Sequence, residues 1–300
     1  MPDMSAKPAK PAKPAMPAMP AMPAMPAMPA LPALPAMQKK KIKNFVPPNM
    51  RQQVSKLSLE EVSSSALVFF DTETTGFGNA TAEIIQISAK CQSRNFDCFV
   101  KPRRGIKSRI TELTGISMLR GIMYHRNIPV ASRDTKTSLI DFMDYLESLQ
   151  QGKVILVAHN AKFDMRILRN ALEANSLSER FHQVCVGFIC TMSLAAAKIP
   201  KSPKGPVNHK MSGLLEFYFG KVEIQLHDAA LDVLALESIF QCMQESFGEL
   251  LPHSYNLYDY WMHQQTVSRA RGIKLKLQSL QRFFIDESHQ ISSKRTIFLI

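Results

Sequence analysis

Short apolar runs separated by polar turns mark the middle of the chain and predict buried strands. Residues 66–70 are wholly apolar, which is typical of a central strand covered on both faces. The first three runs follow one another too closely for βαβ units, so we expect them to form an antiparallel meander. The five expected strands are residues 66–70, 84–89, 96–100, 154–158 and 184–189.

Apolar residues at helical spacing fill the intervals after the third strand. Between residues 137 and 149 they include Leu139, Phe142 and Leu146, which would form one buried stripe. Strands and helices in this order predict an α/β fold with a mixed five-stranded sheet flanked by helices. The expected helices are residues 137–149, 161–174, 211–219 and 229–247.

The two ends of the chain have a different texture. In residues 8–37 proline recurs at every third position, where it fixes φ and removes an amide donor. We therefore expect a disordered Pro-rich tail over residues 1–64 and an ordered domain over residues 65–250. Residues 251–300 would form a basic, partly helical extension, with an amphipathic helix at residues 274–284.

The formal charge of +12 is concentrated at these ends. Residues 1–65 carry nine Lys/Arg against three Asp/Glu, and residues 251–300 carry seven against three. Such ends could steer the chain toward a polyanion or simply form solvated tails. The lysines at 39–41 and 43 leave a similar choice open, between a nuclear localisation signal, a nucleic-acid contact and chance.

Cysteine usage and apolar run lengths restrict the class of protein. The five cysteines include no C-x-x-C pair, which argues against a disulfide scaffold and against a zinc site. No apolar run approaches the ~18 residues that a membrane span needs. The proline repeat also prevents the helical core of a signal peptide. We expect an intracellular protein, in the nucleus or the cytoplasm, with no membrane contact.

Asp71 and Glu73 carry the first candidate chemistry. They lie two residues apart where the first strand ends, so both carboxylates would face the same side of the sheet. Two carboxylates held together are costly unless a cation neutralises them. Oxygen ligands of this kind suit Mg²⁺ or Mn²⁺. The alternative is a pair of solvated acids, which is common for an isolated D-x-E pattern.

Two further acidic segments follow strands or begin helices. Asp164 lies just after the fourth strand, at the edge where α/β sheets place ligands, although it could simply meet a helix dipole. His227 precedes Asp232 at the start of a long helix, and imidazole suits proton transfer near neutral pH. Four acids and a histidine in such places suit two-metal hydrolysis of a phosphodiester. For His159 and Asp228 we favour a hydrogen-bonding histidine and a helix N-terminal acid.

The segments FFDTETTGF, IIQISA, FDCFVKP, ITELTGI, VAHNAKFD and HDAALD resemble, in order and spacing, the motifs of the DEDDh exonucleases. This superfamily includes DnaQ-like proofreading subunits and TREX-type nucleases. The resemblance spans roughly residues 66–245 and implies an RNase-H-like sheet. It also implies a 3′→5′ exonuclease that releases nucleoside 5′-monophosphates.

The resemblance assigns roles to the acidic residues and the histidine. Asp71 would contact both of two Mg²⁺ ions, for which Mn²⁺ would substitute. Glu73 and Asp232 would complete the ligands of the first ion, and Asp164 would hold the second. His227 would be the general base, and its position five residues before Asp232 marks the histidine subclass.

The same resemblance implies a substrate-binding set. Thr74 and Thr75 would lie against the terminal nucleotide, and Asn160 beside the substrate backbone. Phe77 falls where the family usually has a leucine or methionine wedge, so it would stack on a base or tuck into the core. The implied partners are single-stranded or frayed 3′ ends, with DNA favoured over RNA, and a second copy in a homodimer. IIQIS and FDCFVKP look closest to the TREX-like branch and to promyelocytic-leukaemia-type exonuclease domains.

Two other functions compete with an exonuclease. The first is a nucleic-acid-binding module that kept the fold and lost catalysis, against which all five catalytic positions argue. The second is a scaffold whose Pro-rich tail recruits partners. Alanine and methionine dominate that repeat, which favours a spacer over a docking motif.

Overall fold

The computed structural model of the chain describes residues 54–77, 81–149, 152–200, 204–221, 225–243 and 246–267. The proline repeat, the lysine run and the expected helix at residues 274–284 lie outside these residues. So does most of the expected disordered tail, whose disorder therefore stays a prediction. None of the described helices is long and apolar enough to cross a membrane.

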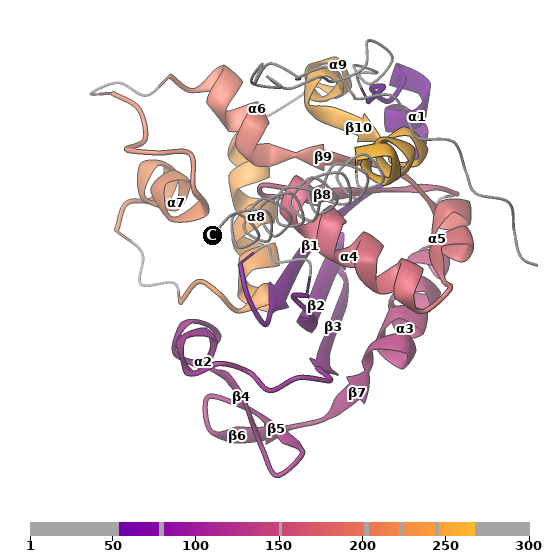
Figure 1. The fold of residues 1–300 in the computed structure, drawn as a ribbon. Helices are drawn as coiled ribbons and strands as arrows, with labels where there is room; N and C mark the ends of the chain where they lie inside the picture. The colour runs from indigo at the N-terminus through magenta and orange to yellow at the C-terminus, as the bar shows by residue number, and fades with distance from the viewer. Residues whose placement is uncertain are drawn as a thin grey trace, which may run out of the picture. The chain divides into compact units, whose positions relative to one another are not determined.

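One seven-stranded sheet organises the described part, in the order β10-β9-β8-β1-β2-β3-β7 (Figure 1). Its five inner strands are the five expected ones, which confirms the mixed α/β sheet. The two edge strands have three residues each, too short a run for an alternating pattern to reveal. The strands are β1 (Ala66–Thr74), β2 (Ile84–Cys91), β3 (Arg94–Lys101), β7 (Ser132–Asp134), β8 (Val154–Ala158), β9 (Cys185–Cys190) and β10 (Ser254–Asn256).

Strand directions decide where the carboxyl ends meet. β1, β2 and β3 form the expected antiparallel meander. β1 is parallel to β8, and β8 is parallel to β9. The carboxyl ends of these three strands therefore lie at one edge of the sheet, where ligands bind in open α/β folds.

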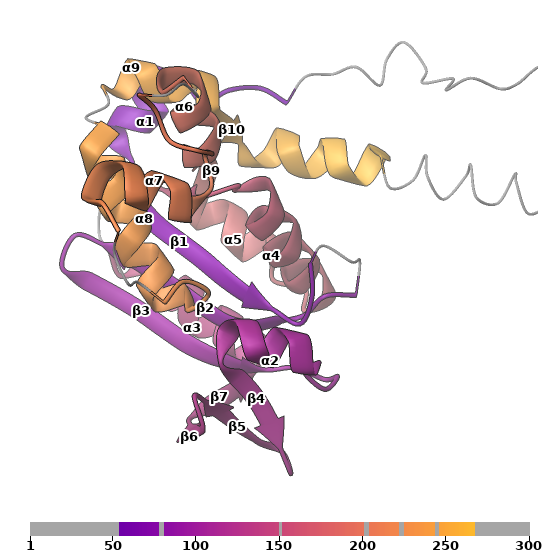
Figure 2. The same cartoon turned by 90° about the vertical axis from the view of Figure 1, so that its left-hand side faces the viewer.

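Helices cover both faces of the sheet (Figures 1 and 2). Neighbouring residues of β1 divide between the two faces: Phe70 stacks on Phe142, whereas Phe69 meets Phe240 edge-on, each pair 5.4 Å between ring centroids. The Phe70 face is covered by α3 (Thr135–Glu147), α4 (Lys162–Ala174), α5 (Ser178–Val184) and a helix at 257–267. The Phe69 face is covered by α1 (Leu59–Ser64), α6 (Thr191–Lys198), α7 (Met211–Phe219), α8 (Ala229–Met243) and α9 (Phe247–Leu250).

An additional small unit lies between β3 and β7, and the hydrophobic pattern did not predict it. It consists of α2 (Ser108–Thr114) and a three-stranded sheet of β4 (Ile116–Leu119), β5 (Ile122–His125) and β6 (Ile128–Val130). Ile110, Ile116 and Met123 pack with Ile85 of β2 in a core of their own. These few buried residues are spread over short elements, so they form no periodic run from which the unit could be predicted.

The packed unit continues beyond residues 65 and 250, the edges expected for the domain. Leu57 is 3% exposed, and its amide donates to Ser254 Oγ over 3.0 Å. A short 3-10 turn, η2 (Leu251–His253), leads into β10, and Tyr260 and Trp261 join the core on the Phe70 face. Residues 54–64 and 251–267 therefore belong to the same folded unit.

Candidate active site

β1 extends past its apolar run and carries Asp71 and Glu73 within the strand. Ladder pairing continues to residue 73, with Asp71 opposite Ser88 and Glu73 opposite Gln86, and a bulge follows. Because alternate residues share a face, both carboxylates lie on the Phe69 face, toward α8. The sequence placed them after the strand; the pairing with β2 holds them inside it.

Thr72, between the two acids, points to the opposite face and reaches α4. Its hydroxyl donates to Oδ1 of Asp164 over 2.7 Å. Asn160, in a left-handed conformation with φ of 60°, makes the turn that leads from β8 into α4. Asp164 is only 3% exposed in the first turn of that helix. The turn and the hydroxyl together bring the α4 carboxylate to the acids of β1.

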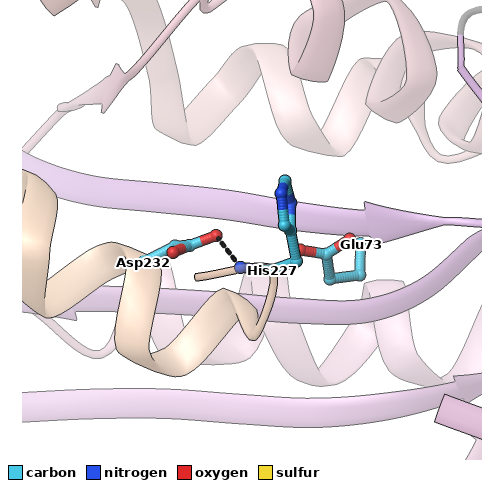
Figure 3. Close-up of side chains that lie close together, drawn as sticks. All are labelled: Glu73, His227 and Asp232. Carbon is cyan, nitrogen blue, oxygen red and sulfur yellow. Dashed lines mark hydrogen bonds between the residues drawn. The ribbon is translucent and has the colours of Figure 1, made fainter. Parts of the chain in front are cut away.

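The last two residues are Asp232, in the first turn of α8, and His227, just before that helix. The His227 amide donates to Oδ2 of Asp232 over 3.0 Å, which closes the turn before the helix. His227 itself has φ of 72° and is exposed, whereas Asp232 is buried. One donor atom from each of Glu73, His227 and Asp232 lies within 4.8 Å of the others (Figure 3).

Burial and mutual repulsion raise the pKa of all four carboxyl groups of the candidate site. Burial, with repulsion by neighbouring acids, raises the pKa of Glu73 to about 8 and that of Asp232 to about 7. Burial also raises the pKa of Asp164 to about 7, against the opposing bond from Thr72. The pKa of Asp71 is raised well above its usual range by burial and by Asp164. Carboxyl groups whose pKa values are perturbed in this way are typical of functional sites.

These residues fit a divalent cation. Oδ1 of Asp232 is buried and has no hydrogen-bond partner among the described residues. An orphaned carboxylate oxygen beside three other carboxylates calls for a positive ligand. The all-oxygen acidic set suits a hard cation such as Mg²⁺ or Mn²⁺. Asp71 and Asp164 line the same cavity but lie outside the tight Glu73, His227 and Asp232 group.

A cavity of about 240 Å³ joins most of the expected substrate residues to the acids. Phe77 is 63% exposed on its rim, which excludes the alternative that it is tucked into the core. Thr75 does not line the cavity; its hydroxyl accepts the Glu83 amide over 3.0 Å. Eight of the nine expected site residues do line it: Asp71, Glu73, Thr74, Phe77, Asn160, Asp164, His227 and Asp232.

His159 is a structural residue, as the sequence favoured. Its ring nitrogens meet Thr191 Oγ1 at 3.0 Å and the backbone oxygen of His209 at 2.9 Å. Burial lowers the pKa of His159 to about 4, so the ring is neutral at pH 7. These contacts tie the end of β8 to the loop before α7, whose Met211 lines the cavity.

Asp228 has more partners than a helix N-terminal acid requires. Oδ1 accepts the Ala230 amide over 3.1 Å, as suits the helix N-terminal acid that was expected. Oδ2 also lies 3.4 Å from His125 Nε2 and 3.5 Å from Arg126 Nη2, both on the β5–β6 hairpin. Gln86 Nε2 donates to Oδ1 over 3.3 Å. The sequence indicated none of these partners: the hairpin was not predicted, and Gln86 lies on a predicted strand 142 residues away in the chain.

The family model of the Exuperantia RNase H-like domain matches residues 65–215, just over half of the chain. The chain belongs to the Exuperantia RNase H-like domain family, within the DnaQ-like, DEDDh exonuclease superfamily. This confirms the RNase-H-like fold and the superfamily that the motifs indicated. The matched region includes Asp71, Glu73 and Asp164 and ends before His227 and Asp232. Assignment to the TREX-like branch stays a prediction.

Two curated relatives are similar over part of their length. A PolC-type DNA polymerase III from Caldanaerobacter subterraneus subsp. tengcongensis is 30% identical over 190 residues, 61% of this chain and 12% of that protein. Maternal protein exuperantia-1 from Drosophila pseudoobscura pseudoobscura is 28% identical over 162 residues, 49% of this chain and 31% of that protein. The chain thus spans less than a third of either relative.

Among solved structures, cell-death related nuclease 4 is similar with a TM-score of 0.48 and 20% sequence identity. That similarity covers 60% of this chain and 64% of the nuclease.

Proposed function

We propose that the protein is a metal-dependent 3′→5′ exonuclease that removes nucleoside 5′-monophosphates from a free 3′ end. The observation that carries this proposal is the convergence of carboxylates from β1, α4 and α8, with His227, in one cavity. Three buried acids and the partly exposed Asp71 gather here, and phosphodiester hydrolysis needs such a group to hold cations.

Asp71, Glu73, Asp164 and Asp232 would hold two Mg²⁺ ions, with Mn²⁺ able to substitute. When bound, such ions neutralise the phosphate and stabilise charge on the attacking and leaving oxygens. Thr72 orients Asp164 through its hydroxyl, and the amide of His227 orients Asp232. Bonds of this kind fix ligand direction and tune affinity for the ion.

His227 would act as the general base. Its side chain is exposed at the cavity, so water and substrate can reach it, and burial of part of the ring lowers its pKa. The neutral imidazole would take a proton from the attacking water. The oxygen of that water bonds to phosphorus, and the bond from phosphorus to the 3′ oxygen of the preceding nucleotide breaks. That oxygen leaves as a new 3′ hydroxyl after it gains a proton.

The cavity rim would hold the terminal nucleotide. The exposed ring of Phe77 offers a face for a base, a contact worth about 1–3 kcal/mol in other single-strand binders. Thr74 and Asn160 line the cavity and would contact the sugar and the backbone. Thr75 would support this rim through Glu83 instead of touching the nucleotide. Single-stranded or frayed ends fit best, with DNA favoured over RNA.

A matched pair of variants tests the proposal. Wild-type protein with Mg²⁺ should shorten a 5′-labelled single strand stepwise, and EDTA should stop the reaction. Asp232→Asn should abolish it, whereas Asp141→Asn should not, since Asp141 lies on α3 outside the cavity and pairs with Arg133 of β7. Loss of label from the 5′ end, or equal activity in Asp232→Asn, would contradict a 3′→5′ exonuclease built on this site.

A catalytically silent nucleic-acid-binding module is the second candidate. The similarity to exuperantia-1 favours it, because that relative is described as a maternal protein and not as a nuclease. Such a module would bind the same labelled strand with no shortening in Mg²⁺ or Mn²⁺. It would also bind equally well after Asp232→Asn.

A further inference from the structure

The segment that leads from β3 into α2 is strongly basic. Residues 101–109 contain five Lys/Arg and no Asp/Glu, and each of the five basic residues is exposed. The last two residues of this segment begin α2, which lines the cavity with Ile110, Leu113 and Thr114. The carboxyl end of the basic segment therefore leads directly into residues that line the acidic cavity. A basic run on a surface is commonly just solvated, so its position relative to the site has to decide its meaning.

Arg109 contacts the rim directly. Its guanidinium carbon lies 5.9 Å from the ring centroid of Phe77, within the range of a cation–π contact. Phe77 lines the cavity and remains 63% exposed. Within the part of the chain that the structure describes, Lys107 and Arg109 form no ion pair. Both cations are thus free to meet an anion, and Arg109 would do so beside an open aromatic face.

Glu83 fixes the segment to the candidate site. Its carboxylate accepts Arg103 Nε and the Arg104 amide, each over 3.0 Å. Its backbone exchanges hydrogen bonds with Thr75, at 2.9 Å and 3.0 Å. The basic segment is therefore held in a set position behind Thr74 and Phe77.

A second hollow, of about 470 Å³, is lined by Glu83 itself. Arg103 and Arg104 line it together with Asn170 of α4 and with Asn175, which caps the carboxyl end of that helix. Cationic and amide donors in one hollow suit phosphate oxygens. The basic segment thus runs from the rim of the acidic cavity to a polar hollow beside it.

We propose that residues 101–109 form a phosphate track, which binds the backbone of the strand upstream of its terminal nucleotide. The inference rests on the proposed function and adds the path of the polymer. Mg²⁺ would offset the charge at the acids themselves, whereas the phosphates upstream of the cavity need cations supplied by the protein. The track supplies these cations where Phe77 would stack the terminal bases. Its ligand is a phosphodiester backbone, which both DNA and RNA carry.

The test separates binding of the polymer from the chemistry. Lys107→Ala/Arg109→Ala would be assayed on an oligothymidylate of about 12 nucleotides and on the p-nitrophenyl ester of thymidine 5′-monophosphate. With the oligonucleotide, KM should rise, and the slope of log KM against log salt should fall by roughly 0.7 for each lost phosphate contact. Hydrolysis of the ester, which has no upstream phosphates, should stay at the wild-type rate.

Controls separate charge, stacking and folding. Lys153→Ala removes a cation at the amino end of β8, away from the cavity, and should leave both substrates unchanged. Arg109→Lys keeps the charge and should show the wild-type slope of log KM against log salt. Oligouridylate in a parallel series distinguishes RNA from DNA. An unchanged KM and slope in the double variant would overturn the track. If wild type hydrolyses neither substrate, the exonuclease proposal fails, and fluorescence anisotropy with the same oligonucleotides still tests the track.

Discussion

The hydroxyl of Thr72 donates to Oδ1 of Asp164 over 2.7 Å, so a residue of β1 orients a carboxylate of α4. Thr72 lies between Asp71 and Glu73, whose side chains face the opposite side of the sheet. Asp71, Thr72 and Glu73 therefore all line one cavity, although Thr72 projects from the opposite face of the sheet. This relationship makes Thr72 a positioning residue for the proposed metal site.

Thr72→Val should weaken the response to Mg²⁺ without unfolding the protein. The valine keeps the shape and removes the donor that holds Asp164, so the concentration of Mg²⁺ needed for half-maximal activity should rise about 10-fold to 100-fold. Thr72→Ser keeps the hydroxyl and should behave as wild type. A Mg²⁺ titration of exonuclease rate measures both. An identical Mg²⁺ dependence in Thr72→Val would show that the bond does not position a ligand.

The metal-free protein should lose stability as pH rises from 5 to 8. Burial raises the pKa of Glu73 from its ordinary value of 4.5 to about 8, so over this range the folded state keeps a proton that the unfolded chain has released. The folded state then binds more protons, and its free energy of unfolding falls with rising pH. Thermal unfolding in EDTA at a series of pH values measures the trend.

Two additions to that experiment identify the cause. Mg²⁺ should raise Tm most at pH 8, because it neutralises the ionised carboxylates and binds only the folded state. Glu73→Gln should flatten the pH dependence in EDTA while it reduces exonuclease activity. A Tm that climbs between pH 5 and 8 in EDTA would contradict the assigned pKa shifts.

His227 should set the acidic limb of the pH–rate profile. Since burial lowers its pKa below 6.5, the imidazole stays neutral, and able to accept a proton, to a lower pH than a free histidine. The rate should therefore fall only when the pH drops below the lowered pKa of His227. His227→Ala should reduce kcat by about 10²-fold to 10⁴-fold and remove this limb. Added imidazole should restore part of the rate; a fully active His227→Ala would exclude the role.

Two phenylalanines should separate stability from function. Phe142 is fully buried and stacks on Phe70, so Phe142→Ala should lower the free energy of unfolding by about 3–5 kcal/mol. Phe77 is exposed on the cavity rim, so Phe77→Ala should leave stability within about 0.5 kcal/mol of wild type while raising KM for a single strand. Urea unfolding and steady-state kinetics on the same preparations make the comparison. Equal effects of both variants on stability would contradict it.

Much of the fold followed from the pattern of residues. The inner strands are long enough for an apolar run to show, and the helix at residues 211–219 was predicted with the bounds of α7. The edge strands and the small sheet of β4, β5 and β6 were missed, because strands of three or four residues are too short to show an alternating pattern. β1 was predicted to end at residue 70, since its last residues are polar and only pairing with β2 reveals them as strand.

The sequence by itself determined which residues carry the candidate chemistry. Asp71, Glu73, Asp164, His227 and Asp232 match the DEDDh motifs in order and spacing, and periodicity placed them at strand ends and helix starts. The tertiary structure alone decided their mutual distances and partners: Thr72 on Asp164, the hairpin on Asp228, and Arg109 over Phe77. The reason is physical. Local patterns report which face a side chain takes within its own element, whereas long-range contacts depend on how elements distant in the chain pack and pair.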